Sequence, residues 1–458
     1  MDNFIIVNGV LKQYLGADEE IIVPDSVIRI DNSVFSGNST VKRLTIPDSV
    51  TEIGYEAFCD CTVLEEVSLP KHITKLEDSL FAGDVSLKRV TIPDGVIEIE
   101  NFVFTDCKSL ERIVIPDSVT EIGLCVFYCC ESLNHIVISR KLESIPCCIV
   151  DASENVSEYR YISENERYSY NIWPAFDGCD CIKSIVFPGN LTKIDMCTFS
   201  RCKSLKTVVL ENGVISIGPY AFSDCPELKD IRIPESVSEI GRNAFEECKM
   251  LESVEIPDNV SSISICAFKN CSALRNIRLP NDIDCLGAGA FYGCSALEAI
   301  TLPKKLTALA TNMERKKGIG EEVSEFAYTP FGMFQRCSRL ISIEIPKNIS
   351  IIDVCAFADC TSLEEVILYA GLLIIRDYAF AQCTSLKKIM IPETVKAIER
   401  NAFEGCTSLM SIIIPESVRN IEEDVFRGCS SELVIYGQSG SCAETYANEY
   451  RIRFKSIR

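Results

Sequence analysis

Histidine, tryptophan and positive charge are all scarce in this sequence of 458 residues. It has two histidines and one tryptophan, so a metal site built on histidine has few residues to draw on. Lys and Arg number 45 against 66 Asp and Glu, which gives a net charge of −21. A chain this acidic lacks the positive potential that non-specific binding to nucleic acid or anionic lipid requires. The composition therefore predicts a protein that does not bind nucleic acid.

Long apolar runs are also missing. No uninterrupted apolar stretch reaches the roughly 18 residues that a membrane-spanning helix needs, so no membrane insertion is predicted. The first residues, MDNFIIVNGVLKQY, combine an acidic Asp2 with an apolar run much shorter than the core of a secretory signal. We therefore expect a cytoplasmic protein, and a cell-surface location only if a leader precedes this sequence.

Repetition is the dominant feature of the sequence. Phenylalanine recurs every 23 residues in three runs, which together make sixteen units without a substitution at this position. A period in the twenties is typical of solenoids, in which each unit buries its apolar face only against its neighbours. The sequence therefore predicts one continuous core instead of three domains. The sixteen positions are Phe35, Phe58, Phe81, Phe104, Phe127, Phe176, Phe199, Phe222, Phe245, Phe268, Phe291, Phe334, Phe357, Phe380, Phe403 and Phe426.

Each unit contains a short strand whose orientation follows from its pattern. In LERIVIP, Ile113 and Ile115 share one side of an extended segment, so Arg112 and Val114 face the other side. Pro116 cannot donate a hydrogen bond to a neighbouring strand and ends the segment. Strands of this kind can stack in parallel from one unit to the next.

The rest of the unit returns the chain to the next strand. Val119 and Ile122 form a second apolar pair that predicts a minor strand or extended turn. The following LCVFYCC segment is expected to turn through a short helical or 3₁₀ segment that carries Phe127 into the core. The phenylalanines would then form a continuous aromatic spine.

The consensus C-x-x-L-x-x-I-x-I-P…V-x-x-I-G-x-x-A-F resembles the 23-residue, BspA-like class of bacterial leucine-rich repeats. The resemblance extends from about Glu20 to Tyr436. It implies a β-rich leucine-rich repeat solenoid, a right-handed superhelix of the α/β type. Its parallel sheet would be concave, with short strands and helical or 3₁₀ turns on the convex side. Members of this family act mainly as protein-interaction or adhesion modules.

The predicted organisation is one structural domain with a cap at each end. Residues 1–19 form an N-terminal hairpin, because Asn8-Gly9 lies between two apolar runs, and this hairpin would cover the open edge of the first repeat. Residues 20–436 form the sixteen-repeat solenoid, with insertions near 147–173 and 310–330. Residues 437–458 form a C-terminal cap with a loop, a short helix and a closing strand.

Fourteen of the 25 cysteines lie three residues after a spine phenylalanine. A small, weakly polar residue is needed at this turn, and a free cysteine behaves as a small buried hydrophobe. The cysteine ladder is therefore predicted to be structural, and its reduced state suits the cytosol. The fourteen are Cys61, Cys107, Cys130, Cys179, Cys202, Cys225, Cys248, Cys271, Cys294, Cys337, Cys360, Cys383, Cys406 and Cys429; Asn38 and Asp84 replace the other two.

The remaining cysteines do not have the spacing of zinc ligands, and no phosphate-binding loop or serine-centred elbow is present. We therefore predict no metal, no cofactor and no catalytic residue.

The candidate partner site is the outward face of the main sheet near the first insertion. Four valines follow one another in one outward column, a local basic stripe lies in the adjacent column, and the insertion is rich in aromatic residues. The alternatives remain open that the valines simply fit a pleated surface and that the aromatics pack back on the solenoid. The candidate residues are Val114, Val137, Val186, Val209, Arg89, Arg112, His135, Tyr168, Tyr170 and Trp173, with Ile367, Met390 and Ile413 as a secondary patch.

These features predict a non-enzymatic scaffold that binds another macromolecule, first of all a protein, through its concave face and first insertion. One alternative is a cell-surface adhesin that binds carbohydrate or matrix, although no aromatic residue is expected in the outward columns. A third reading is an enzyme with a site at the insertions, for which no constellation of residues can be assembled.

Overall fold

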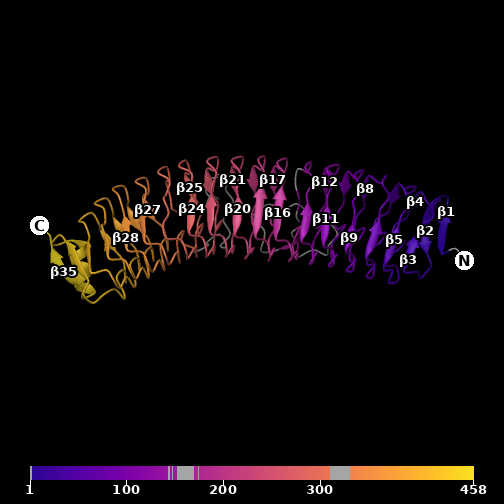
Figure 1. Cartoon of the computed structure of the whole chain (residues 1–458). Helices are drawn as coiled ribbons and strands as arrows, with labels where there is room; N and C mark the ends of the chain where they lie inside the picture. The colour runs from indigo at the N-terminus through magenta and orange to yellow at the C-terminus, as the bar shows by residue number, and fades with distance from the viewer. Residues whose placement is uncertain are drawn as a thin grey trace. The chain divides into compact units, whose positions relative to one another are not determined.

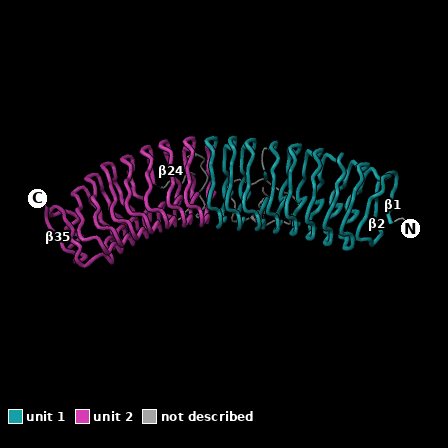
Figure 2. Tube along the Cα trace, in the orientation of Figure 1, with its two compact units in different colours: residues 1–236 teal, residues 237–458 magenta. Residues whose placement is uncertain are grey.

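The computed structural model describes residues 3–142, 145–146, 148–151, 170–173, 175–309 and 331–457. The chain divides into two compact units, unit 1 (residues 1–236) and unit 2 (residues 237–458), shown in different colours in Figure 2. Each unit is a parallel β-solenoid built from successive turns of the 23-residue repeat, with one row of main strands and one row of minor strands (Figure 1). That the whole solenoid is one continuous domain stays a prediction.

In unit 1 the main strands pair in parallel from one repeat to the next, in two sheets that meet at the first insertion. The strand phase is as predicted: Ile113 is buried, whereas Arg112 and Val114 are exposed. The first sheet contains β3 (Glu20–Ile22), β5 (Arg43–Thr45), β7 (Glu66–Ser68), β9 (Arg89–Val90), β11 (Arg112–Val114) and β13 (His135–Val137). The second contains β16 (Ser184–Phe187), β18 (Thr207–Leu210) and β20 (Asp230–Arg232).

The minor strands of unit 1 are two residues long. They are β4 (Arg29–Ile30), β6 (Glu52–Ile53), β8 (Lys75–Leu76), β10 (Glu98–Ile99), β12 (Glu121–Ile122), β17 (Lys193–Ile194) and β19 (Ser216–Ile217). The predicted N-terminal hairpin is present as β1 (Phe4–Val7) and β2 (Val10–Tyr14), which pair antiparallel. Its strand β2 pairs in parallel with β4, the minor strand of the first repeat. The hairpin thus covers the edge of the minor sheet and leaves β3 as the first strand of the main sheet.

Unit 2 repeats this arrangement. Its main strands are β22 (Ser253–Glu255), β24 (Asn276–Arg278), β26 (Ser342–Glu344), β28 (Glu365–Ile367), β30 (Lys388–Ile389), β32 (Ser411–Ile413), β34 (Val434–Gly437) and β35 (Arg453–Ser456). Its minor strands are β21 (Glu239–Ile240), β23 (Ser262–Ile263), β25 (Cys285–Leu286), β27 (Ile351–Ile352), β29 (Ile374–Ile375), β31 (Ala397–Ile398) and β33 (Asn420–Ile421). The helix α1 (Cys442–Glu449) lies between β34 and β35, which pair in parallel. The C-terminal cap therefore extends the main sheet.

The segments that carry the spine phenylalanines are hydrogen-bonded turns and not the predicted helical or 3₁₀ segments. The residues two before and two after the phenylalanine have positive φ in most repeats, for example Cys125 (φ 53°) and Cys129 (φ 57°) around Phe127. A left-handed residue interrupts the hydrogen-bond pattern of a helix. The amides bond to the next repeat instead, as when Phe104 N–H donates to the Val126 carbonyl at 3.0 Å.

The phenylalanine spine forms the centre of the core, as predicted. Consecutive rings stack almost face to face: Phe81 and Phe104 have centroids 5.6 Å apart with planes 6° from parallel, and Phe357 and Phe380 are 5.4 Å apart at 5°. All four rings are fully buried. Each repeat therefore stabilises its neighbours through the same column of contacts, which is why the architecture can propagate.

The cysteine ladder runs beside the spine. Thirteen of its fourteen members are buried, and Cys429 is half-buried. Its thiols donate to the carbonyl oxygen of the spine phenylalanine of the preceding repeat, for example Cys225 Sγ to Phe199 O at 3.0 Å and Cys383 Sγ to Phe357 O at 3.2 Å. Burial raises the pKa of Cys225 to about 12, so this thiol stays protonated as a donor.

Candidate functional site

The four candidate valines form an exposed apolar row on the main sheet of unit 1. The exposed fractions are 45% for Val114, 43% for Val137, 51% for Val186 and 39% for Val209. Val114 is in register with Val137, and Val186 is in register with Val209. The inward neighbours on the same strands are buried, so the strand alternation places the valines on the surface. We call Val114, Val137, Val186 and Val209 the valine row.

The basic stripe lies next to the beginning of the valine row. Arg89, Arg112 and His135 are exposed and lie in direct register on β9, β11 and β13. Like charges opposite each other on neighbouring strands destabilise a sheet unless something neutralises them. In the same column, Arg43 forms an ion pair with Glu20 on β3. The column therefore alternates in sign at its start and has no carboxylate at Arg89, Arg112 or His135, beside the first valines.

A hollow of about 160 Å³ lies at the start of this column. It is lined by three cationic and three anionic side chains: Arg43, Lys88, Arg89, Glu65, Glu66 and Glu111. Within it, Lys88 Nζ lies 2.8 Å from Glu65 Oε2, and that hydrogen bond holds the pKa of Glu65 below its usual range. Arg112 does not line this hollow.

The predicted aromatic wall lies outside the residues whose side chains the structure describes. Tyr168 is not among the described residues. Tyr170 and Trp173 begin and end β15 (Tyr170–Trp173), which pairs antiparallel with β14 (Cys148–Asp151). The structure thus adds a two-stranded antiparallel sheet, β14 and β15, within the first insertion, which the sequence pattern did not predict.

The secondary patch is also exposed, and it is longer than predicted. The exposed fraction is 41% for Ile367, 65% for Met390 and 47% for Ile413. Met390 and Ile413 are joined by an isolated parallel bridge. The column continues to Tyr436, which is in register with Ile413 and half-buried. The expectation that no aromatic residue belongs to the outward columns was therefore wrong, because β34 continues the sheet beyond β32. Applying the same column rule one repeat further would have found Tyr436.

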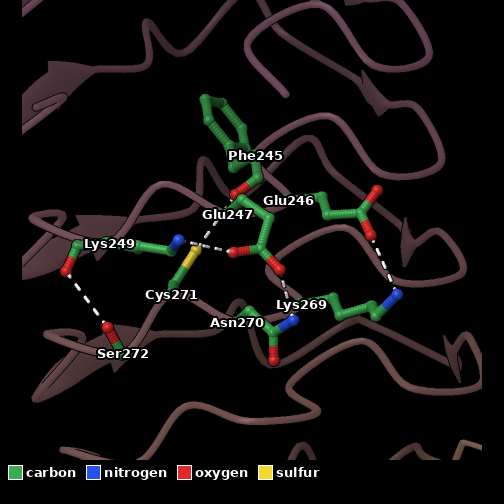
Figure 3. A network of polar contacts seen from close by, with 8 residues as sticks. All are labelled: Phe245, Glu246, Glu247, Lys249, Lys269, Asn270, Cys271 and Ser272. Atoms are coloured by element: carbon green, nitrogen blue, oxygen red, sulfur yellow. Dashed lines mark hydrogen bonds and ion pairs between the residues drawn. The ribbon is translucent and has the colours of Figure 1, made fainter. Parts of the chain in front are cut away.

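A network of hydrogen bonds and ion pairs surrounds the ladder cysteine Cys271 on the turns of unit 2 (Figure 3). Lys269 Nζ lies 2.9 Å from Glu246 Oε1, and Glu247 accepts a hydrogen bond from Asn270 and forms an ion pair with Lys249. Cys271 Sγ donates to the backbone carbonyl of Phe245 at 3.1 Å, and burial raises the pKa of this thiol well above its usual value. The network links one repeat to the next. Because its pKa is raised, the buried Cys271 stays a protonated thiol, which is a poor nucleophile.

The described part of the chain holds neither a metal-binding cluster nor a membrane-spanning helix. No group of three or more His, Cys, Asp or Glu residues there is arranged to hold a metal ion. No helix in the same residues has the length and apolar character needed to cross a membrane.

Comparison with known proteins agrees with the repeat pattern. The model of the BspA type leucine-rich repeat region matches residues 17–89, 74–206, 173–266, 238–313 and 329–453. The structure is similar to that of a leucine-rich repeat protein from Bacteroides ovatus, with 25% identity, coverage of 98% of this chain and 94% of that chain, and a TM-score of 0.53. A leucine-rich cell surface protein from Faecalibacterium prausnitzii is 24% identical, with coverage of 97% and 94% and a TM-score of 0.43. No functionally curated protein matches the chain.

Proposed function

The chain belongs to the BspA-type leucine-rich repeat family, whose fold is a binding scaffold, and we propose on this basis that it binds a protein partner without catalysing a reaction. The proposed contact surface is the outward face of the main sheet in unit 1, centred on the valine row. The first insertion leaves the solenoid at this point, since β14 follows β13 and β15 precedes β16.

The observation that carries this proposal is the exposure of four valines in one column. A half-exposed valine gains about 1 kcal/mol when a partner covers it, so the row offers about 3–4 kcal/mol of apolar anchor. That is a minority of the free energy that a stable complex requires, because association also costs translational freedom and side-chain order. Polar contacts must therefore supply the rest, and the basic stripe beside the row is in place to do so.

The test is a double substitution, Val137→Glu with Val186→Glu, in the full chain. Both side chains face solvent, so folding should be retained, and far-UV circular dichroism checks this. Thr45→Glu is the matched control, because Thr45 occupies the same outward column three repeats before Val114. The proteins captured by the wild type, the control and the double variant are compared by quantitative mass spectrometry.

The outcome separates the two patches. We expect at least one partner to be captured by the wild type and by Thr45→Glu and to be lost with the double variant. A partner that the folded double variant still captures would move the site away from the valine row. The next candidate would then be the patch of Ile367, Met390 and Ile413, tested by Met390→Glu.

We further propose that the protein works in a reducing compartment such as the cytoplasm. Ladder cysteines in successive repeats are about 4.8 Å apart along the stack, within the range of Cα separations that a disulfide spans. Cys406 and Cys429 are such a pair in adjacent repeats, and their thiols donate to the backbone carbonyls of Phe380 and Phe403. An oxidising compartment would act on such pairs, so the proposal is tested by measuring the redox state of Cys429 in protein taken directly from cells. A Cys406–Cys429 disulfide in that material would contradict it.

A further inference from the structure

We propose that the valine row and the cations beside it recognise an acidic, extended segment of the partner, with apolar side chains on the valines and carboxylates at Arg112 and Lys183. This inference rests on the proposed function and adds the chemistry of the partner to it.

The first step is that the charges before the row are already balanced. Three cations and three carboxylates share the hollow at the start of the column. Arg43 is paired with Glu20, and Lys88 is paired with Glu65. A partner that approached this part of the sheet would have to break ion pairs before it gained new ones, so it is a poor place for a charged ligand.

The second step is that Arg112 is not balanced. Its neighbours in register are Arg89 and His135, and neither is acidic. Among the described residues, no carboxylate lies within ion-pairing distance of Arg112. Arg112 and Val114 are on the same face of β11, so the unpaired guanidinium stands at the edge of the valine row.

The third step is a second cation on the other side of the sheet break. Lys183 directly precedes β16, the strand that carries Val186, and is exposed. It too has no carboxylate within ion-pairing distance among the described residues. It has the position of Glu111 in its repeat, one residue before the column of Arg112, whose counterpart on β16 is Ser184. A cation thus lies near the valine row on each side of the first insertion.

These observations favour one kind of ligand. Four exposed valines favour apolar side chains, and the unpaired guanidinium favours a carboxylate, which it can bind through two parallel hydrogen bonds. Main strands lie about 4.8 Å apart and an extended chain rises about 3.3 Å per residue, so about five residues cross the row. A segment of this kind could carry acidic residues at its ends and apolar residues between them. The overall charge of −21 argues against a nucleic acid or an anionic lipid surface as the alternative source of negative charge.

The experiment uses the intact protein and a phage-displayed library of random dodecapeptides. The enriched peptides are resynthesised with a fluorescent label, and their affinities are measured by anisotropy against the wild type and four variants, one of which is Arg112→Glu. Arg112→Ala removes the unpaired cation. Arg43→Ala is the matched control, because Arg43 lies in the same column but is already paired with Glu20. The double variant Val137→Glu with Val186→Glu tests the valine row itself.

We expect the enriched peptides to combine Asp or Glu with Ile, Leu, Val or Phe. Arg112→Ala should weaken their binding at least tenfold, and Arg43→Ala should change it less than twofold. Arg112→Glu should bind a peptide whose Asp or Glu has been replaced by Lys more tightly than the wild type does, and this charge swap shows that the contact is electrostatic.

The inference would be overturned by an enriched set that is basic or uncharged, by equal loss of affinity with Arg112→Ala and Arg43→Ala, or by a library that yields no peptide at all. If the double valine variant loses binding while Arg112→Ala retains it, the acidic partner is wrong and the proposed surface stands. If neither variant changes binding, both the inference and the proposed surface are wrong.

Discussion

Asp84 provides the sharpest test of how the ladder stabilises this fold. It occupies a cysteine position of the ladder and is fully buried. Its Oδ1 accepts the backbone N–H of Cys61 at 2.7 Å, whereas its Oδ2 has no hydrogen-bond partner among the described residues. Desolvation raises the pKa of this carboxyl well above its usual value, against the lowering effect of the Cys61 N–H and with a smaller contribution from Asp60. Asp84→Cys should therefore stabilise unit 1.

The magnitude has two parts. A buried polar atom without a partner costs about 1–3 kcal/mol, so Asp84→Cys should raise the free energy of unfolding by about that amount at pH 4. The second part depends on pH. Because the folded-state pKa is raised, the unfolded chain releases the proton first as pH rises above about 4. Wild-type stability should then fall relative to the variant by up to about 1.4 kcal/mol per pH unit, until the pH passes the folded-state pKa.

The assay is urea unfolding followed by circular dichroism between pH 4 and pH 8, with Asp84→Asn as a second variant. Asp84→Asn keeps an acceptor for the Cys61 N–H but cannot ionise, so it should remove the pH-dependent part of the difference. Asn38→Cys is the matched control at the other ladder exception, where Oδ1 already accepts the N–H groups of Thr40 and Val41. It should give neither a gain in stability nor a pH-dependent difference. Equal stability of wild type and Asp84→Asn at every pH would refute the reasoning.

Three further predictions concern the spine, the ladder and a gap in the main sheet. Phe380→Ala removes a fully buried ring stacked between Phe357 and Phe403 and should lower the free energy of unfolding by about 3–5 kcal/mol. The control Met390→Ala, on the surface, should change that free energy by less than about 0.5 kcal/mol. Similar urea midpoints for both variants would contradict the role of the phenylalanine spine in stability. The ladder thiols should be alkylated only after denaturation, whereas the exposed Cys181 should be alkylated in the native protein, as counted by mass spectrometry. Rapid labelling of most ladder positions in the native protein would contradict the prediction that the ladder is buried. In unit 2 the backbone of 299–302 forms no strand, and no described hydrogen bond joins it to β24. Its amides should therefore exchange with deuterium faster than those of β28, which is paired on both sides. Slower exchange at 299–302 would show that the main sheet is continuous there.

Much of the fold could be predicted because every repeat carries the same pattern of apolar and polar residues. The alternation of Ile113 and Val114 places one side chain inside and the other outside, and this rule acts between residues next to each other in sequence. The spacing of the phenylalanines set the stacking of one repeat on the next. Asn8-Gly9 marked the hairpin, and its conformation, with φ of 51° and 78°, is the kind that this pair adopts readily. None of these features requires knowledge of a distant contact.

The candidate site was predictable only in part. The exposure of the valine row followed from the strand phase, and so did the position of Arg112 beside Val114. Which charges of the column are paired did not follow, because Arg43 and Arg112 occupy the same position within their repeats. What distinguishes them is the neighbouring strand 23 residues away: Arg43 meets Glu20, and Arg112 meets Arg89.

The repeating sequence by itself thus determined the solenoid, the inward and outward columns and the buried thiol ladder, because these depend on short-range alternation and on a constant period. Tertiary structure alone decided where the ends attach and which charges pair. The hairpin joined the minor sheet through β2 and β4, the cap carried the outward column on to Tyr436, and left-handed residues turned the chain where a helical segment was expected. Each of these outcomes depends on which backbone and side-chain groups of a neighbouring repeat are free to bond, and no single repeat contains that information.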